Sequence, residues 1–218
     1  MKIFLDTADL GAIQKWSRCG VVDGVTTNPS IMRKEGVRDI EEGAKAIARL
    51  IGDRPLSVEV TTNDHGKTLD QARTFATWAP NIVVKIPVIN ESGESCLEVI
   101  RELEEGGIRV NTTAILSLGQ FMLSAKAGAT YLSIFAGRIS DEGGDAPAVI
   151  KSALAWLSQW NTRARVIVGS LRQVLDLNLA AATGAHILTV PPPLLTKWLD
   201  HRYSRETVRQ FVEDAGKI

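Results

Sequence analysis

The feature that most constrains the fold of this chain is an alternation of short apolar, β-branched runs with longer stretches of helical periodicity. Each apolar run has the length of one strand, and several are nearly unbroken, as strands buried on both faces are. The intervening stretches are long enough for the helices that connect consecutive parallel strands. The predicted strands are residues 3–6, 21–26, 56–61, 82–87, 109–113, 131–135, 165–169 and 186–190.

Eight strand–helix units in 218 residues predict an α/β fold whose strands close into a (β/α)8 TIM barrel. A doubly wound open sheet is the rival arrangement. The clearest helical stretches are residues 63–78, 93–105 and 146–160. No linker rich in Gly, Ser or Pro divides the chain, so residues 1–218 are predicted to form a single domain.

The chain after the eighth predicted strand has a different character. Residues 191–193 are three prolines that stop the sheet, and residues 194–199 can start a helix. A last helix, residues 204–216, has an apolar stripe made of Val208, Phe211, Val212 and Ala215. That stripe would either close the bottom of the barrel or dock on a neighbouring subunit.

The charge balance limits the partners of the chain. Its 25 basic residues offset its 25 acidic residues, so no overall field attracts nucleic acid or an anionic membrane. Two distant cysteines, Cys19 and Cys96, make a poor disulfide framework. The N-terminal segment is acidic where a signal peptide is apolar, and no stretch approaches the roughly 20 apolar residues of a membrane span. We therefore expect a cytoplasmic protein with neither nucleic-acid nor membrane partners.

Polar side chains stand at nearly every predicted strand end, which is where a TIM barrel carries its chemistry. In chain order these residues are Asp6, Thr26, Asn28, Glu59, Lys85, Asn111, Thr113, Ser133 and Ser170, and Phe135 shares the strand face of Ser133. Because side chains alternate between the two faces of a strand, the pattern predicts a polar ring around Lys85 inside the barrel. A bulge in any one strand would remove its member from this ring.

Lys85 lies in the apolar sequence Val-Val-Lys-Ile-Pro and shares a strand face with Val83, so it is predicted to point into the barrel. Two interpretations are open. Lys85 forms a structural ion pair with Asp6 or Glu59, or it is a nucleophilic amine. Burial favours the neutral form of an amine, which attacks a carbonyl carbon to form an imine.

Imine chemistry also needs groups that move protons, and the carboxylates Asp6 and Glu59 are the ring members able to act as bases. Asp6, in the sequence Asp-Thr-Ala-Asp, has the alternative role of capping the first helix. Glu59 lies inside Ser-Val-Glu-Val-Thr and has no such role. Asn28 precedes Pro29, so it is predicted to cap a helix, which is compatible with a contact to substrate.

A phosphate site is predicted near the seventh strand. Arg172 is expected in the first turn of the following helix, where a cation opposes the helix dipole and a bound anion would resolve the conflict. Ser170 supplies a hydroxyl and N–H groups at the same place, as phosphate sites in TIM barrels often do. Arg138, just after the sixth strand, would be a second ligand of the anion. Alternatively, both arginines are solvated surface residues.

Metal and nucleotide signatures do not occur in the sequence. The three histidines share no ligand spacing, and there is neither a Gly-x-Gly-x-x-Gly motif nor a P-loop. We therefore predict neither a metal site nor a nucleotide or dinucleotide cofactor.

The chain resembles the transaldolases, in the short form that also includes the fructose 6-phosphate aldolases. The likeness extends over essentially the whole length, and the sequence Thr-Thr-Asn-Pro-Ser at residues 26–30, followed by Lys-Ile-Pro at residues 85–87, is its most specific part. Further matching segments are Leu5-Asp6-Thr7-Ala8, Asn111-Thr112-Thr113-Ala114, Gly137-Arg138-Ile139, Ser170-Leu171-Arg172 and Thr189-Val190-Pro191.

The resemblance implies a TIM barrel without a cofactor, in which Lys85 forms the Schiff base. Asp6 would take the proton of the C4 hydroxyl during carbon–carbon cleavage, and Glu59 with Thr113 would hold a catalytic water. The dihydroxyacetone moiety would be bound by Asn28, Asn111 and Ser133, and the phosphate by Arg138, Ser170 and Arg172.

Two positions separate the subtypes within this resemblance. Aldolase-type members are similar but carry glutamine where Glu59 stands and tyrosine where Phe135 stands, so this chain has the transaldolase residue at both positions. Short members also tend to form ring-like homo-oligomers with an exchanged C-terminal helix. This implies a pentamer or a decamer, and it is consistent with the apolar stripe of residues 204–216.

The resulting hypothesis is a transaldolase that moves a dihydroxyacetone unit from a ketose phosphate to an aldose phosphate through a lysine Schiff base. The runner-up is a fructose 6-phosphate-type aldolase that releases free dihydroxyacetone. An alternative of another class is a sugar-phosphate-binding barrel without catalysis, because a fold and a phosphate site do not establish turnover. Pentose-phosphate metabolism is the default source of the substrates.

Overall fold

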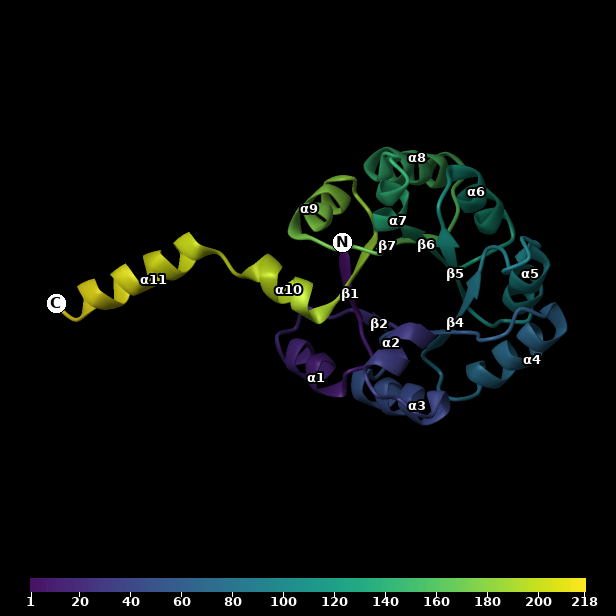
Figure 1. The fold of residues 1–218 in the computed structure, drawn as a ribbon, viewed down its shortest axis with the longest axis horizontal. Coiled ribbons are helices and arrows are strands. Elements are labelled where there is room, and N and C mark those ends of the chain that lie inside the picture. The colour runs from purple at the N-terminus through teal and green to yellow at the C-terminus, as the bar shows by residue number, and fades with distance from the viewer.

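The computed structural model describes residues 1–218, in which a ring of parallel strands is surrounded by helices (Figure 1). Neighbouring strands pair in chain order, and β8 pairs with β1, so the sheet is closed. This confirms the predicted TIM barrel and excludes the open sheet. The strands are β1 (Lys2–Asp6), β2 (Gly24–Thr26), β3 (Leu56–Glu59), β4 (Ile82–Pro87), β5 (Val110–Ile115), β6 (Tyr131–Phe135), β7 (Arg165–Gly169) and β8 (Ile187–Val190).

Nine helices lie between the strands, and two follow β8. They are α1 (Leu10–Arg18), α2 (Pro29–Lys34), α3 (Ile40–Ile51), α4 (His65–Ala76), α5 (Leu97–Glu105), α6 (Leu118–Lys126), α7 (Ala136–Asp141), α8 (Ala146–Gln159), α9 (Val174–Ala182), α10 (Pro192–Leu199) and α11 (Arg202–Ala215). The cap of α1 is Asp9, whose carboxylate accepts the N–H groups of Gly11 and Ala12. The capping role considered for Asp6 therefore belongs to Asp9.

Several element boundaries differ from the predicted ones. The largest difference is at α5, which begins at Leu97 rather than at residue 93. The side-chain oxygen of Asn90 accepts the N–H groups of Ser92 (3.0 Å) and Glu94 (2.9 Å), and this turn occupies the first residues of the predicted helix. In addition, β2 begins at residue 24 rather than 21, and β3 ends at residue 59 rather than 61.

The interior of the barrel is apolar at the end where the strands begin. Phe4, Ile167 and Ile187 form a separate buried cluster there, with Tyr131 packed against it. The Phe4 ring fits only because residue 24 is glycine, since a Cβ atom at that position would lie 2.6 Å from the ring. These side chains close the bottom of the barrel, so a ligand can enter only from the carboxyl ends of the strands.

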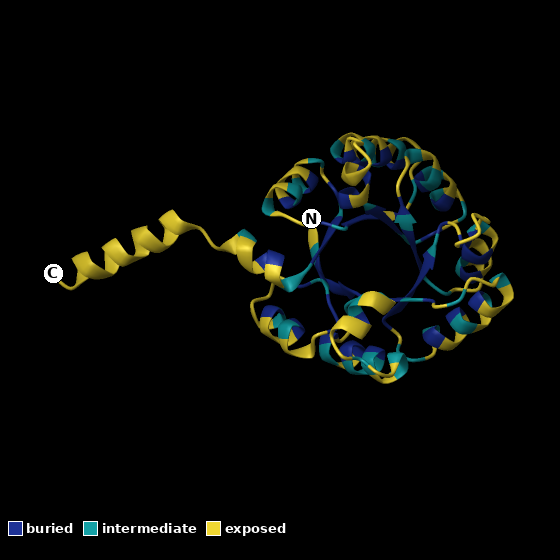
Figure 2. Ribbon diagram, viewed as in Figure 1, coloured by how far each residue is buried: buried dark blue, intermediate teal, exposed yellow.

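The outer face of the sheet packs against the helices. Ile82, Val84 and Ile86 of β4 belong to the large core cluster between sheet and helices, whereas Val83 does not. Lys85 therefore shares the interior face with Val83, as the alternation along β4 predicts. Figure 2 shows the strands as a continuous buried ring inside a layer of half-buried helices.

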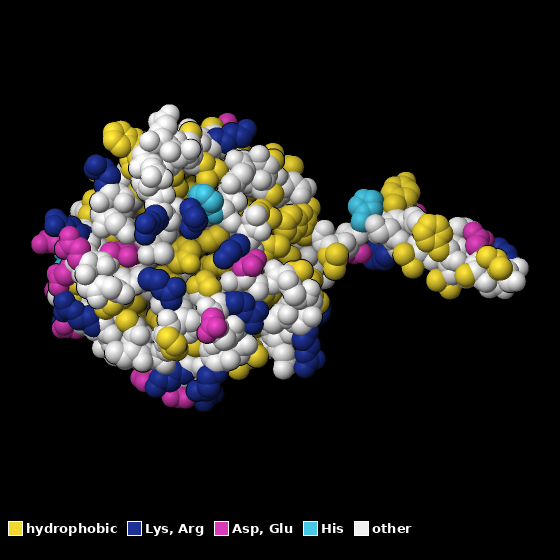
Figure 3. All heavy atoms as spheres, turned by 180° about the vertical axis from the view of Figure 1, so that it is seen from behind, with side chains coloured by type: hydrophobic (Ala, Val, Ile, Leu, Met, Phe, Trp, Pro, Cys, Tyr) yellow, Lys and Arg dark blue, Asp and Glu magenta, His cyan; other side chains and the backbone are white.

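The C-terminal helix α11 projects away from the barrel and has no buried residue (Figures 1 and 2). Its residues Val208, Phe211 and Val212 are 59%, 66% and 69% exposed. Figure 3 shows apolar side chains along this projecting segment. The interpretation that the stripe closes the barrel bottom is therefore wrong, because Phe4 and its neighbours do so. None of the helices combines the length and apolar character needed to cross a bilayer.

Candidate active site

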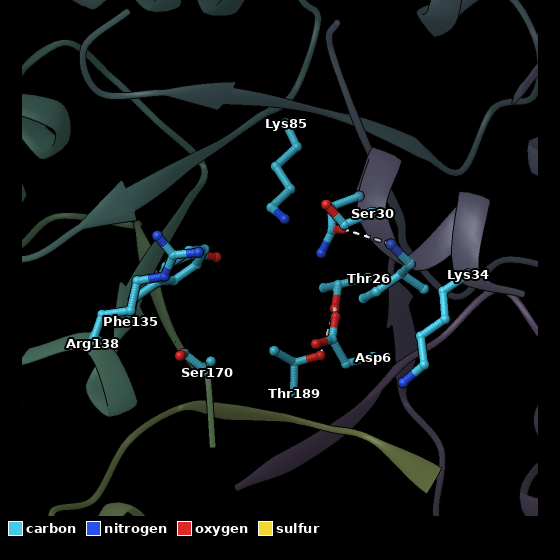
Figure 4. A pocket seen from close by; sticks show the side chains of 13 residues that line it. Asp6, Thr26, Ser30, Lys34, Lys85, Phe135, Arg138, Ser170 and Thr189 are labelled. Carbon is cyan, nitrogen blue, oxygen red and sulfur yellow. Dashed lines mark hydrogen bonds between the residues drawn. The ribbon is translucent and has the colours of Figure 1, made fainter. Parts of the chain in front are cut away.

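Lys85 lies inside the mouth of the barrel and is 4% exposed. Its Nζ atom is 2.9 Å from Glu59 Oε2 and donates a hydrogen bond to the carbonyl oxygen of Thr27 at 3.2 Å. An ammonium group has three N–H donors, so these two contacts leave one direction free. In Figure 4 the lysine side chain points into the cavity. The ion pair with Glu59 that the sequence suggests is present, and its geometry also suits proton transfer between the two groups.

Asp6 ends β1 and lines the same cavity as Lys85. Burial raises the pKa of the Asp6 carboxyl above its ordinary value, against the opposing effects of Lys85 and of the hydrogen bond from Thr26. A carboxyl group with a raised pKa is the kind of group that accepts and returns a proton near neutral pH.

A chain of two hydroxyl groups supports the Asp6 carboxylate. Thr26 Oγ1 donates to Asp6 Oδ1 at 2.7 Å, and Thr26 Oγ1 lies 2.5 Å from Thr189 Oγ1. Because the only hydroxyl hydrogen of Thr26 is directed at Asp6, Thr189 must be the donor in the second contact. The chain therefore runs from β8 through β2 to β1 and fixes the orientation of the carboxylate (Figure 4).

A second hydrogen-bonded chain lies on the interior face of β3, β5 and β6. Ser133 Oγ donates to Asn111 Oδ1 at 2.7 Å, and Asn111 Nδ2 donates to Ser57 Oγ at 3.0 Å. All three residues are buried, but only Ser133 lines the cavity. Because its hydrogen is directed at Asn111, the Ser133 oxygen presents its lone pairs to a ligand.

Thr113 precedes an irregularity in β5 and does not line the cavity. The register of β5 against β6 shifts between Thr112 and Ile115, and Ala114 has a φ of 58°, in the left-handed region. The irregularity comes after Thr113, because β5 stays in register with β4 through Thr113, which pairs with Pro87 as Asn111 pairs with Lys85. Thr113 therefore keeps the strand face of Asn111. The Thr113 side chain is fully buried, and its hydroxyl has no hydrogen-bond partner. Sequence periodicity did not reveal the bulge, because Ala114 gives no local signal for it.

Asn28 has the capping role that the sequence predicts. Its Oδ1 accepts the N–H of Ile31 at 2.9 Å, at the start of α2, and Pro29 occupies the first helical position. The Asn28 side chain also lines the cavity. The carbonyl oxygen of its amide is therefore engaged in the cap, and the NH₂ group is available to a ligand.

The far side of the cavity is formed by β6 and by α7, which follows it directly. The ring of Phe135 lies between two cations, with its centroid 6.0 Å from Lys85 Nζ and 5.6 Å from the guanidinium carbon of Arg138. Arg138 is exposed and directed along the cavity edge, next to Ser170 (Figure 4). These positions agree with the predicted anion-binding side of the site.

Ser170 sits in a strained loop. Its φ of 59° is unusual for a serine, and its carbonyl oxygen would lie 2.1 Å from a Cβ atom at Gly137. Only glycine at position 137 therefore allows the start of α7 to approach the loop after β7 so closely. The strained loop and the neighbouring helix end together hold Ser170 at the edge of the cavity.

The predicted position of Arg172 is wrong. The helix α9 begins at Val174, so Arg172 lies in the loop before it and not in the first turn. Its two terminal nitrogens both bond to the carboxylate of Asp141, at 2.5 Å, and this pairing lowers the pKa of Asp141. The Arg172 side chain does not line the cavity that contains Lys85. The conflict between a cation and the helix dipole, from which the sequence argument began, is absent.

A carboxylate of the first turn of α9 bonds the segment that leads into the helix. Asp176 Oδ2 accepts the N–H groups of Arg172 (2.9 Å) and Gln173 (3.1 Å), so the first turn carries its own carboxylate. These two N–H groups are therefore not available to a phosphate, whereas the prediction concerns the N–H groups of Gly169 and Ser170. Of the predicted phosphate ligands, Arg138 and Ser170 line the cavity.

The cavity has a volume of about 280 Å³, which suits a small sugar phosphate better than a nucleotide. The predicted residues that line it are Asp6, Thr26, Asn28, Lys85, Ser133, Phe135, Arg138 and Ser170. The predicted residues that do not line it are Glu59, Asn111, Thr113 and Arg172. Glu59 and Asn111 nevertheless contact residues that do, namely Lys85 and Ser133.

Five lining residues are not among the predicted site residues: Ser30, Ile31, Lys34, Gly169 and Thr189. Thr189 lies one residue before the end of β8 and shares its interior face with Ile187, so the strand-end rule could have found it. Ser30, Ile31 and Lys34 belong to α2, which folds over the mouth of the barrel (Figure 1). No sequence signal indicates which face of so short a helix meets the cavity.

Comparison with known sequences agrees with this geometry. The chain matches the family described as Transaldolase/Fructose-6-phosphate aldolase over residues 3–217. It is 42% identical to the probable transaldolase 2 of Listeria monocytogenes over 214 residues, which cover 98% of this chain and 95% of that protein. It is 39% identical to the probable transaldolase of Dehalococcoides mccartyi, with 98% of this chain and 97% of that protein covered.

Solved structures that resemble this one are distant in sequence. A putative phosphonomutase from Burkholderia cenocepacia superposes with a TM-score of 0.60 at 17% identity, over 97% of this chain and 93% of that chain. Thiamine phosphate pyrophosphorylase from Pyrococcus furiosus gives a TM-score of 0.60 at 13% identity, over 87% and 85% of the two chains. These two likenesses concern the barrel fold alone. The sequence match over nearly the whole length shows that the chain belongs to the transaldolase/fructose-6-phosphate aldolase family.

Proposed function

We propose that this protein is a transaldolase, which transfers a dihydroxyacetone unit from a ketose phosphate to an aldose phosphate through a Schiff base on Lys85. The observation that carries the proposal is the buried Lys85 amine, 2.9 Å from the Glu59 carboxylate, in a cavity that Asp6 also lines. Family membership and relatives named probable transaldolase support it.

Schiff-base formation begins with a proton transfer. Lys85 passes one ammonium proton to Glu59, which leaves a neutral amine and a neutral acid in contact. The amine attacks C2 of the ketose, and the C2 oxygen takes one proton from the amine. A second proton from Glu59, relayed by the water that Glu59 and Thr113 hold, lets this oxygen leave as water. A protonated imine remains on Lys85.

Cleavage then uses Asp6. The Asp6 carboxylate takes the proton of the C4 hydroxyl, the C4–O bond becomes a carbonyl, and the electrons of the C3–C4 bond move into the imine. The products are an aldose phosphate and a neutral enamine on Lys85. In the second half of the reaction the enamine carbon attacks the acceptor aldehyde, Asp6 returns its proton to the new hydroxyl, and water hydrolyses the imine. The raised pKa of Asp6 suits both directions of this transfer.

The substrate groups are distributed along the cavity. Asn28 and Ser133 bind the dihydroxyacetone part, in which the available NH₂ group of Asn28 donates and the Ser133 oxygen accepts, and Asn111 orients the Ser133 hydroxyl. Arg138 and Ser170 bind the phosphate. Arg172 joins them only after it leaves Asp141, because its terminal nitrogens are engaged by that carboxylate. The acceptor is a sugar phosphate of the kind found in cytoplasmic pentose-phosphate metabolism.

The main alternative is a fructose 6-phosphate-type aldolase with the same Schiff base. Glu59 and Phe135 favour the transferase, since the aldolase-type members that this chain resembles carry glutamine and tyrosine at these positions. A non-catalytic sugar-phosphate-binding barrel is disfavoured by the lysine, because a buried ion pair at a ligand cavity is costly to maintain for binding alone.

We also propose that the protein is a homo-oligomer, a pentamer or a decamer. The support is the projecting helix α11, whose apolar residues Tyr203, Val208, Phe211 and Val212 are all more than half exposed. Large apolar side chains displayed together in this way are typical of subunit interfaces.

The test of the proposed function is a substrate panel with products identified by mass. A ketose phosphate is supplied with and without an aldose phosphate, to the wild type and to Lys85→Ala. The proposal predicts a new ketose phosphate only when both substrates are present, and none with Lys85→Ala. Release of free dihydroxyacetone without an acceptor, at the rate of the complete reaction, would support the aldolase instead. Binding without any product would support the non-catalytic barrel.

A further inference from the structure

Glu35 is an exposed residue outside the cavity, and its carboxylate reaches the segment that follows Asp6. The Thr7 hydroxyl donates to both of its oxygens, at 2.9 Å and 3.1 Å, and the Ala8 N–H donates to Oε2 at 2.5 Å. These contacts join residues that are 27 and 28 positions apart in the chain. The loop after α2 is thereby tied to the loop after β1.

The placement of this carboxylate is not explained by helix or ion-pair stabilisation. Glu35 is the C-cap of α2, where the helix dipole disfavours a negative charge. It takes part in none of the ion pairs of the chain. The Thr7 and Ala8 groups are therefore its only partners.

The tie acts directly on the backbone that carries Asp6. The Thr7 N–H donates to the Thr26 carbonyl at 3.2 Å, and the fully buried Thr7 hydroxyl accepts the N–H of Asp9 at 3.1 Å while it donates to Glu35. Without the carboxylate, the Thr7 hydroxyl and the Ala8 N–H would lose these partners at the start of the α1 cap. The residues after Asp6 would then be held less firmly.

We propose that Glu35 is a positioning residue, which fixes the segment after β1 so that the Asp6 carboxyl keeps its direction toward Lys85. The inference rests on the proposed function, in which Asp6 moves the C4 hydroxyl proton. Glu35 does not touch the substrate in this role, because it does not line the cavity.

The negative charge of Glu35 has an effect that can be separated from that of its hydrogen bonds. The negative charges of Glu35 and Glu59 add to burial in raising the pKa of Asp6, while Lys85 and the Thr26 hydrogen bond oppose them. The other charged residues that line the cavity are Lys34 of α2 and Arg138 of α7. Removing the charge of Glu35 should lower the pKa of Asp6, so the loss of activity on the acidic side should move to lower pH.

Two variants separate position from charge. Glu35→Ala removes both the hydrogen bonds and the charge, whereas Glu35→Gln keeps an oxygen that accepts from Thr7 and Ala8. Glu41→Gln is the matched control, because Glu41 is a nearby surface carboxylate that pairs with Lys45 on α3 and contacts neither loop residue. Thermal unfolding of each variant first establishes that it is folded.

The readouts are kcat, its pH profile, and the mass of the adduct trapped by borohydride with a ketose phosphate. We expect Glu35→Ala to lower kcat by about 10-fold or more, which is within the range for a misplaced base. Because cleavage is then slowed, the uncleaved donor should accumulate as the adduct on Lys85. Glu35→Gln should lose less activity and shift the acidic limb to lower pH, more at low salt than at high salt. Glu41→Gln should match the wild type.

The outcomes distinguish the inference from the proposed function. If the wild type forms no adduct on Lys85, the proposed function fails and the inference fails with it. If the wild type is trapped and active, but both Glu35 variants keep its kcat, adduct masses and pH profile, only the inference is overturned. A lowered melting temperature with those three readouts unchanged would also overturn it, since Glu35 would then be merely structural.

Discussion

The two sides of the cavity differ in how their side chains are held. On one side Lys85, Glu59 and Asp6 stand on strands, inside the barrel, in hydrogen bonds and an ion pair of 2.7 to 2.9 Å. On the other side Arg138 and Ser170 stand on a short helix and a strained loop, and Arg138 has no ion-pair partner, although its guanidinium lies over the Phe135 ring. The strand side has little freedom to move, whereas the loop side can adjust to the ligand.

This difference suggests a division of labour. Proton transfer requires heavy atoms at hydrogen-bond distance and an orientation that does not change during the reaction, and the strand-borne groups satisfy that requirement. Recognition of a phosphate tolerates several arrangements, because guanidinium and hydroxyl groups can approach it from many directions. Mutations on the strand side should therefore reduce kcat, and mutations on the loop side should raise KM.

The largest effect is expected from Lys85→Ala, which removes the proposed nucleophile. Turnover should fall by about 10⁴-fold or more, as it does when a covalent catalyst is deleted. Steady-state rates with a saturating ketose and aldose phosphate measure this directly. A residual rate within 10-fold of the wild type would show that the side chains on the strand side do not carry out the reaction.

Asp6→Asn should have the next largest effect, a fall in kcat of about 10² to 10³-fold from the loss of a positioned base, with little change in KM. In the wild type, activity should decline as the pH falls through the raised pKa of Asp6, because the protonated carboxyl no longer accepts the C4 hydroxyl proton. This acidic limb should be absent from the residual activity of the variant. A large rise in KM with an unchanged kcat would place Asp6 with the binding residues.

The same substitution should affect stability in the opposite direction. Because the folded pKa of Asp6 is raised, folding favours the protonated form, and the ionised carboxyl lowers the free energy of unfolding at neutral pH. Asp6→Asn should therefore raise the melting temperature near pH 7. The gain should shrink as the pH falls toward the ordinary value of 3.8 and should disappear below it. A lower melting temperature at pH 7 would mean that the contacts of the Asp6 carboxylate stabilise the folded protein by more than the burial of its charge destabilises it.

On the loop side, Arg138→Ala should raise KM for a phosphorylated ketose by about 10- to 100-fold, as the loss of a charge-assisted hydrogen bond predicts, and leave kcat almost unchanged. The KM of an unphosphorylated ketose should not change. Comparing the two substrates in the same variant isolates the phosphate contact. An equal effect on both would show that Arg138 acts through the Phe135 ring instead.

The smallest effects are expected at Arg172 and Asp141. Arg172→Ala should raise KM for the phosphorylated ketose less than Arg138→Ala does, because Arg172 must first leave Asp141. Asp141→Asn should lower this KM slightly by releasing the guanidinium. Both variants should melt close to the wild type, since exposed ion pairs contribute little to stability. A rise in KM with Asp141→Asn would mean that the carboxylate orients Arg172 for the phosphate.

The contrast between side chains on strands and side chains on loops also explains which site residues could be predicted from the sequence. Lys85, Asp6 and Ser133 were predictable because the two-residue period of a strand and the closure of the barrel fix where a side chain points. The end of β3 was less predictable, because the Thr61 N–H donates to the Gln71 side chain on α4 instead of to a neighbouring strand. Such a contact between distant residues leaves no periodic pattern.

Departures from the predicted pattern have equally local causes. A bulge at Ala114 interrupts β5 after Thr113, and Arg172 precedes a helix that starts two residues later than its position implied. Glu35 gave no signal at all, because an exposed glutamate after a short helix is indistinguishable from ordinary surface polarity until its partners in the loop after β1 are known. Contacts between loops are decided by the folded arrangement and not by local sequence.

The most direct test of the central claim is to trap the enzyme with borohydride in the presence of a ketose phosphate and to map the modified lysine by peptide mass. The account predicts a single adduct on Lys85, absent from Lys85→Ala and retained in Lys34→Ala, which alters the other lysine that lines the cavity. An unmodified wild-type protein, or an adduct that remains in Lys85→Ala, would contradict it.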